Sequence, residues 1–185
     1  GAKIFADGVI ESGTAALLSA APGAGSMEYL LDRGKDNWLR WAQAGFQLHF
    51  HAIGDGAVGA ALDTIARLPD PAQGRHHIAH LQLVSKDDFD RFQALGVTAN
   101  IQALWAFPDE CMTQLTQPKL SNEQNLRMYP FGSLARKGAR LVCGSDWTVS
   151  SLSPFEAMEV AVTRRDPSSN EGPALLPGQA LTVKQ

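Results

Sequence analysis

Hydrophobic and polar positions divide the chain into two kinds of segment. Short apolar runs bounded by glycine, proline or polar residues have the length and composition of buried strands. They cover residues 3–6, 46–51, 76–81, 97–102 and 140–143. Between these runs, apolar residues recur three or four positions apart, which is the spacing of an amphipathic helix. The helical segments cover residues 33–44, 56–68, 85–95, 125–137 and 154–164.

Individual residues set several of the expected helix boundaries. Asp55 and Ser85 precede helical runs in the position of an N-cap, and Pro154 suits the first turn of the last helix. Pro130 should interrupt its helical segment, because proline cannot donate an intrahelical hydrogen bond. The remaining long segments are expected to be loops or irregular structure, and they cover residues 12–26, 103–122 and 166–185.

The alternation of strands and helices predicts an α/β fold with a mainly parallel sheet. Two architectures fit this pattern, an open doubly wound sheet and part of a (β/α)8 TIM-type barrel. In both architectures, functional side chains collect at the C-terminal ends of the strands. Four polar residues occupy such ends in this chain, namely His51, His80, Gln102 and Asp146.

Length and charge limit the classes of partner. The chain has 185 residues and 44% hydrophobic content, which is enough for one sizeable core, so we expect a single domain over residues 1–185. Its 16 basic and 19 acidic residues are scattered and give a net charge of -3. This pattern indicates neither nucleic acid nor an anionic membrane as the partner, and it favours a small-molecule substrate.

Two cysteines, Cys111 and Cys143, are too few and too distant to predict a disulfide framework. No segment resembles a signal peptide or a membrane-spanning helix. The compartment stays open, with the cytoplasm favoured. The first residues read as the middle of a strand, so the natural protein is expected to begin earlier.

The histidines and acids at strand ends are candidates for a metal centre. His51, His80 and Asp146 come from three different strands and supply the imidazole and carboxylate groups that a divalent transition metal prefers. Asp146 could then bind the metal and also accept the proton of the activated water. Each residue also has a structural interpretation, because strand histidines are often hydrogen-bonded and an Asp after Gly-Ser is often a turn residue.

Other candidates are open to two interpretations. His49 precedes His51 by two positions and therefore shares its strand face, where it could be a ligand, a substrate contact or a packing residue. Trp105 and Trp147 could wall a substrate pocket, although aromatic residues usually belong to the core. Spacing alone favours a solvated side chain for Lys3.

Five segments in order resemble amidohydrolase family 3, the branch of metal-dependent hydrolases that includes N-substituted formamide deformylases. They are Lys3 to Gly8 with Thr14 to Leu18, His51 to Asp55, Arg75 to His80, Leu95 to Val97 with Gln102, and Gly144 to Trp147. The resemblance implies a distorted (β/α)8 barrel of which this chain supplies strands four to eight.

The resemblance also implies roles for individual residues. Lys3 is similar to the strand-four lysine that can be carboxylated and bridge two metals, and His51 and His80 are similar to the ligands of strands five and six. Asp146 is similar to the strand-eight ligand and general base. The implied cofactor is one or two divalent ions, with zinc expected, and the implied reaction is hydrolysis of a non-peptide C–N bond.

The chain departs from the family pattern in ways that leave other hypotheses open. The family's strand-one His-X-His pair, its first three strands and its small β-sandwich domain have no counterpart, and Ala79 stands where family members commonly have Glu. Five strands cannot close an eight-stranded barrel, so one alternative is a catalytically incomplete fragment that associates as a homodimer. A deaminase on the same barrel is a further alternative.

Overall fold

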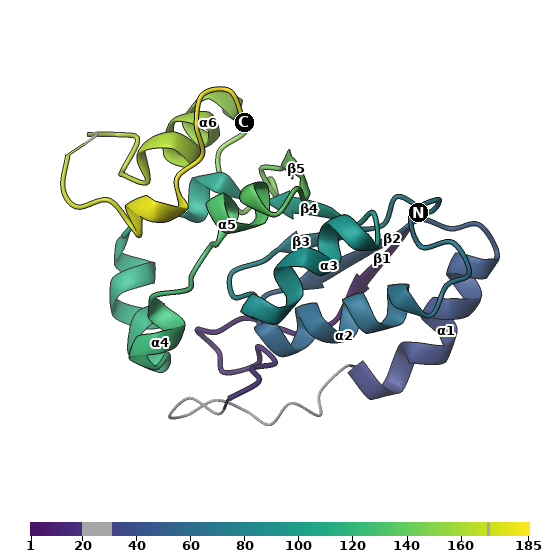
Figure 1. Ribbon diagram of the computed structural model, residues 1–185. Coiled ribbons are helices and arrows are strands. Elements are labelled where there is room, and N and C mark those ends of the chain that lie inside the picture. Colours follow the sequence, from purple (N-terminus) through teal and green to yellow (C-terminus); the bar gives the residue numbers. More distant parts are fainter. Residues whose placement is uncertain (20–30, 170) are drawn as a thin grey trace.

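The computed structural model of the chain describes residues 1–19, 31–169 and 171–185. Five parallel strands form one sheet in the order β1-β2-β3-β4-β5 (Figure 1). The strands are β1 (Ala2–Phe5), β2 (Leu48–Ala52), β3 (His77–His80), β4 (Thr98–Ile101) and β5 (Arg140–Cys143). Each strand pairs with the next along the chain, so the chain crosses over after every strand. The predicted α/β class and parallel sheet are confirmed.

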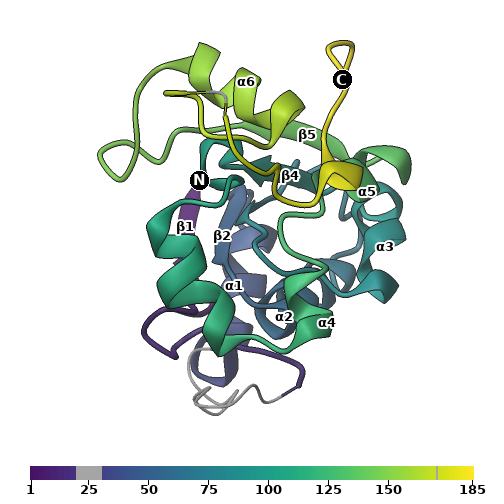
Figure 2. The same ribbon diagram turned by 90° about the vertical axis from the view of Figure 1, so that its left-hand side faces the viewer.

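Helices make most of the crossovers between the strands. They are α1 (Leu31–Gln43), α2 (Asp55–Ala66), α3 (Phe89–Ala94), α4 (Asn122–Asn125), α5 (Phe131–Arg136) and α6 (Pro154–Thr163). Shorter helical turns are η1 (Lys86–Asp88), η2 (Ala103–Trp105), η3 (Met112–Thr116), η4 (Gln117–Lys119) and η5 (Pro177–Gln179). In Figures 1 and 2, α6 lies at the β5 end of the molecule and α1 at the opposite end, which agrees with the packing of α6 on η2 and of α1 on α2 and β2.

The two faces of the sheet differ in polarity. Side chains alternate along a strand, and on one face they are completely buried against the apolar side of the helices. This face includes Leu48, Phe50, Ile78, Ala99 and Ile101. The other face carries Lys3, His49, His77, Thr98 and Arg140 in one row of paired positions. It is the face that would line the inside of a closed barrel.

The structure corrects several expected boundaries. Asp55 is not the N-cap of α2: Gly54 occupies that position in an extended conformation, and Asp55 is the first helical residue. The N-cap at Ser85 is confirmed, since its side chain accepts a hydrogen bond from Asp87 N. Pro154 lies in the first turn of α6 as expected. Pro130 does interrupt its segment, because it lies between α4 and α5.

Two of the segments expected to be loops or irregular structure are only partly so, or only partly described. The segment 103–122 is not simply irregular, because it contains η2, η3 and η4. For the loop expected over 12–26, residues 20–26 lie outside the described residues. Across the ranges that the structure describes, none of the helices has the length and apolar character needed to cross a bilayer.

Candidate metal centre

His51 and His80 meet at the C-terminal ends of β2 and β3. Their ring centroids are 4.5 Å apart and the rings are edge to face, with an interplanar angle of 65°. Ala79, not His80, is the partner of His51 in the strand register, so a regular strand would send His80 to the opposite face. The backbone of His80 has a φ of 79°, which ends the strand and allows its ring to lie against His51. The candidate pair therefore depends on an unusual conformation at the strand end.

The hydrogen bonds of His51 define which ring nitrogen carries its proton. His51 Nε2 lies 2.9 Å from the carbonyl oxygen of Gly8, and a carbonyl can only accept. Nε2 is therefore the donor, which leaves Nδ1 as the nitrogen with a free lone pair. A carboxylate oxygen of Asp7 lies 3.7 Å from the same Nε2. A histidine held in this way has a fixed ring orientation, as metal-binding histidines commonly do.

Asp7 is a site residue that the sequence pattern did not reveal. The residue is 2% exposed, and its carboxylate accepts hydrogen bonds from the backbone N–H groups of Ala16, Ile53 and Gly54 at 2.8 to 3.0 Å. Burial raises the pKa of the Asp7 carboxyl, although these donors and His51 oppose the shift. In the sequence, Asp-Gly after a strand is typical of a turn, so no local signal predicted this role.

His80 is buried and lacks a partner for its Nδ1 atom within the described residues. Burial lowers the pKa of His80 to about 3, with further lowering by His51 and Lys3 and partial compensation by the Gln102 side chain. The ring is therefore neutral at pH 7, which is the form that binds metals. Trp105 stacks on the other side of His80, with centroids 5.1 Å apart and an interplanar angle of 2°.

Lys3 and His49 are paired positions on the open face of the sheet, and the charge of Asp146 acts on both. Burial lowers the pKa of Lys3 and lowers that of His49 to about 4, and the negative charge of Asp146 opposes both shifts. Asp146 therefore faces the same region as Lys3 and His49. His49 stacks loosely on His77, with ring centroids 5.5 Å apart. Asp146 is exposed and has a φ of 51°.

These residues fit a divalent transition metal only in part. His51 and His80 present imidazoles side by side, and the buried Nδ1 of His80 has no partner. No hydrogen bond or ion pair joins either histidine to Lys3 or Asp146 in the described ranges. Accordingly, no three His, Cys, Asp or Glu side chains of the described residues are arranged to hold a metal. The roles of Lys3 and Asp146 as ligands stay predictions.

A cavity of about 570 Å³ lies next to Trp105, and neither His51 nor His80 is among its lining residues. Trp105 lines it, so the side chain that stacks on His80 also forms a wall of the cavity. His49 and Trp147, which were also candidates for substrate contact, are not among the lining residues, and Trp147 is 63% exposed. The expected substrate contacts of His49, Trp105 and Trp147 stay predictions. Of these three side chains, only Trp105 lines the cavity.

Comparison with known proteins decides the family. The profile of the amidohydrolase family matches residues 1–185, the whole chain. The chain belongs to the amidohydrolase family. The resemblance inferred from the five sequence segments is therefore confirmed.

Curated relatives of this amidohydrolase chain come from plants and bacteria. It is 29% identical over 177 residues to Protein LONG AFTER FAR-RED 3 of Arabidopsis thaliana, covering 90% of the chain and 30% of that protein. It is 25% identical over 186 residues to the putative amidohydrolase YtcJ of Bacillus subtilis, covering 98% of the chain and 34% of that protein. The chain thus spans about a third of the length of these relatives.

Solved structures with the same fold include two metal-dependent hydrolases. The one from Pyrococcus horikoshii has a TM-score of 0.78 and 24% identity, and the one from Pyrococcus furiosus has a TM-score of 0.76 and 23% identity. In both cases the match covers 98% of this chain and 36% of the solved chain. These likenesses show that the five βα units form a partial barrel of the amidohydrolase type.

Proposed function

We propose that this chain contributes the catalytic strand ends of a metal-dependent hydrolase that cleaves a non-peptide C–N bond, such as an amide. The observation that carries the proposal is the contact between His51 and His80 at the ends of adjacent parallel strands. Trp105, which stacks on His80, connects this pair to a cavity large enough for a small molecule. The family membership supports hydrolysis as the class of reaction.

The proposed roles follow from the position of each group. His51 and His80 are the metal ligands, and Asp7 and the Gly8 carbonyl orient His51. A divalent ion, with zinc proposed, would lower the pKa of a bound water toward about 7 and polarise the scissile carbonyl. Asp146 is proposed as the group that takes the proton of this water and returns it to the leaving amine, and Lys3, in carboxylated form, as a further ligand.

Trp105 has a second role in the proposal. Its ring covers one side of His80 and lines the cavity, so it would exclude bulk water from the histidines while it contacts the substrate. Excluding water strengthens electrostatic interactions within a site.

A deaminase on the same barrel has less support. It needs a carboxylic acid free to shuttle protons near His51, and Asp55 is the acid that follows this strand. Asp55 is 1% exposed, accepts a hydrogen bond from Leu18 N at 2.9 Å and lies 3.8 Å from Arg127. These contacts give Asp55 a structural role.

Metal analysis tests the proposal directly. The purified protein, incubated with zinc and then desalted, should retain roughly one or more equivalents of metal, and a His51→Ala, His80→Ala double variant should retain none. His77→Ala is the matched control, because His77 is a histidine of β3 outside the pair. Equal metal content in wild type and the double variant would contradict the ligand assignment.

Hydrolysis is tested separately on the metal-loaded protein. A panel of N-substituted formamides and acetamides, followed by detection of the released amine, should reveal turnover that Asp146→Asn lowers by at least a hundredfold, as expected for loss of a general base. Metal binding without turnover on any C–N substrate would retain the metal site and reject the proposed reaction.

A further inference from the structure

The cavity beside Trp105 carries an excess of negative charge. Three carboxylate side chains line it, Glu11 after β1, Asp109 before η3 and Glu156 in the first turn of α6. No lysine or arginine is among the lining residues that the structure describes. The rest of the wall is mostly apolar or aromatic, with Leu104, Trp105, Phe107, Met112 and Tyr129. Three segments far apart in sequence thus bring acids to one apolar cavity.

The protein itself does not neutralise these acids. The hydroxyl of Thr116 donates to the Glu11 carboxylate, and Met112 N donates to Asp109 Oδ1 at 2.6 Å. Lys119 donates to the carbonyl oxygen of Glu11 and not to its carboxylate. Among the described residues, none of the three acids has an ion pair with a basic side chain. The ammonium group of Lys119 thus lies next to the main chain of Glu11 without pairing with its carboxylate, and it offsets the negative charge of the cavity only in part.

Two buried polar side chains also open onto this cavity without partners. Gln82 is 4% exposed and Tyr129 is 3% exposed, and both line the cavity. Neither the amide of Gln82 nor the hydroxyl of Tyr129 has a hydrogen bond to any other described residue. Neither group belongs to the fully buried polar atoms without a partner, and both residues line the cavity, so each can form a hydrogen bond to a molecule bound there. They are independent of the acids and indicate that the cavity is a binding site.

The fields of Glu11 and Asp109 converge on the same part of the wall. Burial raises the pKa of both Cys111 and Tyr129, and in each case the charges of Glu11 and Asp109 raise it further. At Tyr129 the positive charge of Arg164 opposes this shift, so the field of the two carboxylates reaches the tyrosine ring and is partly offset there. An ammonium group is stabilised by this combination of carboxylates and aromatic rings.

We propose that the cavity selects substrates whose non-reacting part is an apolar or aromatic stem that ends in an ammonium group. The ammonium would lie among Glu11, Asp109 and Glu156, and the stem would lie against Trp105 and Phe107. This proposal rests on the proposed function, because it names the substrate class of the same hydrolase. The selectivity belongs to this chain's own residues and requires neither metal nor turnover.

Binding of three matched probes tests the proposal. They are 2-phenylethylammonium, the neutral 2-phenylethanol and the anionic 3-phenylpropionate, measured by calorimetry and by tryptophan fluorescence on the metal-free protein. The ammonium probe should bind roughly tenfold or more tightly than the alcohol, as expected for charge-assisted contacts, and the anion most weakly. Equal binding of the ammonium and alcohol probes, or no binding of any probe, would overturn the proposal.

Variants locate the effect. The double variant Glu11→Gln, Glu156→Gln keeps side-chain size and hydrogen-bond acceptors, so it should lose most of the preference for the ammonium probe while still binding the alcohol. Glu110→Gln is the matched control, because Glu110 is exposed beside Asp109 and does not line the cavity. Unchanged preference in the double variant would place the cation elsewhere and reject the proposal.

The same measurements separate this proposal from the proposed function. Preference for the ammonium probe in a protein that binds no metal would retain the cavity assignment and reject the hydrolase. A protein that binds metal and hydrolyses neutral amides, but shows no preference for cationic ones, would retain the hydrolase and reject the cavity assignment.

Discussion

At the level of single residues, the buried carboxylate of Asp7 holds the candidate site together. It joins the end of β1 to Ala16 and to the turn after β2, and it lies beside His51. Three backbone N–H groups converge on one side chain, and each would be left without an acceptor if the carboxylate were removed. The cost of an unsatisfied buried donor is about 1–3 kcal/mol.

Replacing Asp7 by Asn should therefore destabilise the protein. The single amide oxygen cannot accept from all three donors, and the amide NH2 faces at least one of them, so we expect a loss of about 1–3 kcal/mol in the free energy of unfolding. Urea denaturation followed by circular dichroism measures it. The control is Asp87→Asn, because Asp87 is exposed and its side chain makes no hydrogen bond among the described residues. A shift no larger than that of the control would contradict the structural role of Asp7.

His76 provides a pH-dependent contribution to stability. It is 2% exposed, and its Nδ1 accepts a hydrogen bond from Leu48 N at 2.9 Å, so the folded state needs the neutral ring. Burial lowers its pKa below the usual 6.5, with a smaller contribution from His77. Below pH 6.5 the unfolded chain binds this proton more readily than the folded chain, so stability is lost as the pH falls.

The variant His76→Asn tests this contribution. Asn can still accept from Leu48 N but does not titrate, so stability should fall less steeply between pH 6.5 and pH 5 in the variant than in the wild type. The difference should approach at most about 1.4 kcal/mol per pH unit for one proton. Urea denaturation at several pH values measures both slopes. The measurement at pH 8 serves as the internal reference, because His76 is neutral there in both the folded and the unfolded chain. Parallel slopes would show that His76 is not the titrating group.

At the level of elements, the sequence predicted the order of strands and helices because that information is local. Apolar runs and helical spacing are visible in short windows, and Ser85 and Pro154 mark helix starts by their own chemistry. Contacts between distant segments were not visible in the same way. The role of Asp7 was not predicted, and Asp55 was taken for a cap, because their partners Ile53 and Leu18 lie on other segments.

Arg164, at the end of α6, is another residue whose contacts with distant segments could not be predicted from the local sequence. It is completely buried, and its guanidinium donates to the carbonyl oxygens of Leu175 and Tyr129 and lies 5.3 Å from the Phe131 ring. An arginine at a helix end normally indicates an exposed position, so no local pattern predicted that Arg164 would lie in the core. The side chain links the C-terminal segment to the cavity wall through three backbone and ring contacts.

The turn between β2 and α2 allows a sharp test of element packing. A Cβ added to Gly54 would lie 2.1 Å from the carbonyl oxygen of Ala16, an oxygen that accepts the hydrogen bond of Gly56 N. Gly54→Ala should therefore displace the segment around Ala16 and lower the free energy of unfolding by about 1–3 kcal/mol. Gly178→Ala is the control, since no atom lies within 4 Å of a Cβ there. Thermal melts that coincide for both variants would contradict this packing.

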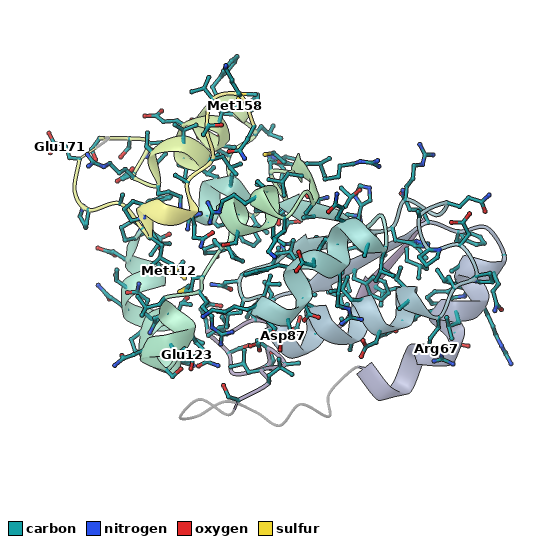
Figure 3. The ribbon with its side chains drawn as sticks, in the orientation of Figure 1. Arg67, Asp87, Met112, Glu123, Met158 and Glu171 are labelled. Carbon is teal, nitrogen blue, oxygen red and sulfur yellow. The ribbon has the colours of Figure 1, made fainter. Side chains whose placement is uncertain are left out.

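At the level of the whole molecule, the partial barrel leaves apolar surface exposed. Along α6 and the segment before it, Val149, Leu152, Phe155 and Met158 are 60–78% exposed. In Figure 3, Met158 projects from α6 on the side away from the sheet. The open face of the sheet adds Phe5, which is 60% exposed. The exposed apolar side chains on successive turns of this one segment favour association with another protein surface.

The isolated chain is therefore expected to self-associate, in agreement with the homodimer considered from the sequence. Light scattering after size-exclusion chromatography should show an average mass that rises with protein concentration. The double variant Phe155→Glu, Met158→Glu should shift the protein to the monomer, because burying two like charges without partners opposes contact. Leu126→Glu is the control, since Leu126 is 69% exposed but lies outside this patch. A wild-type chain that stays monomeric at all concentrations would show that the exposed apolar surface does not drive association by itself.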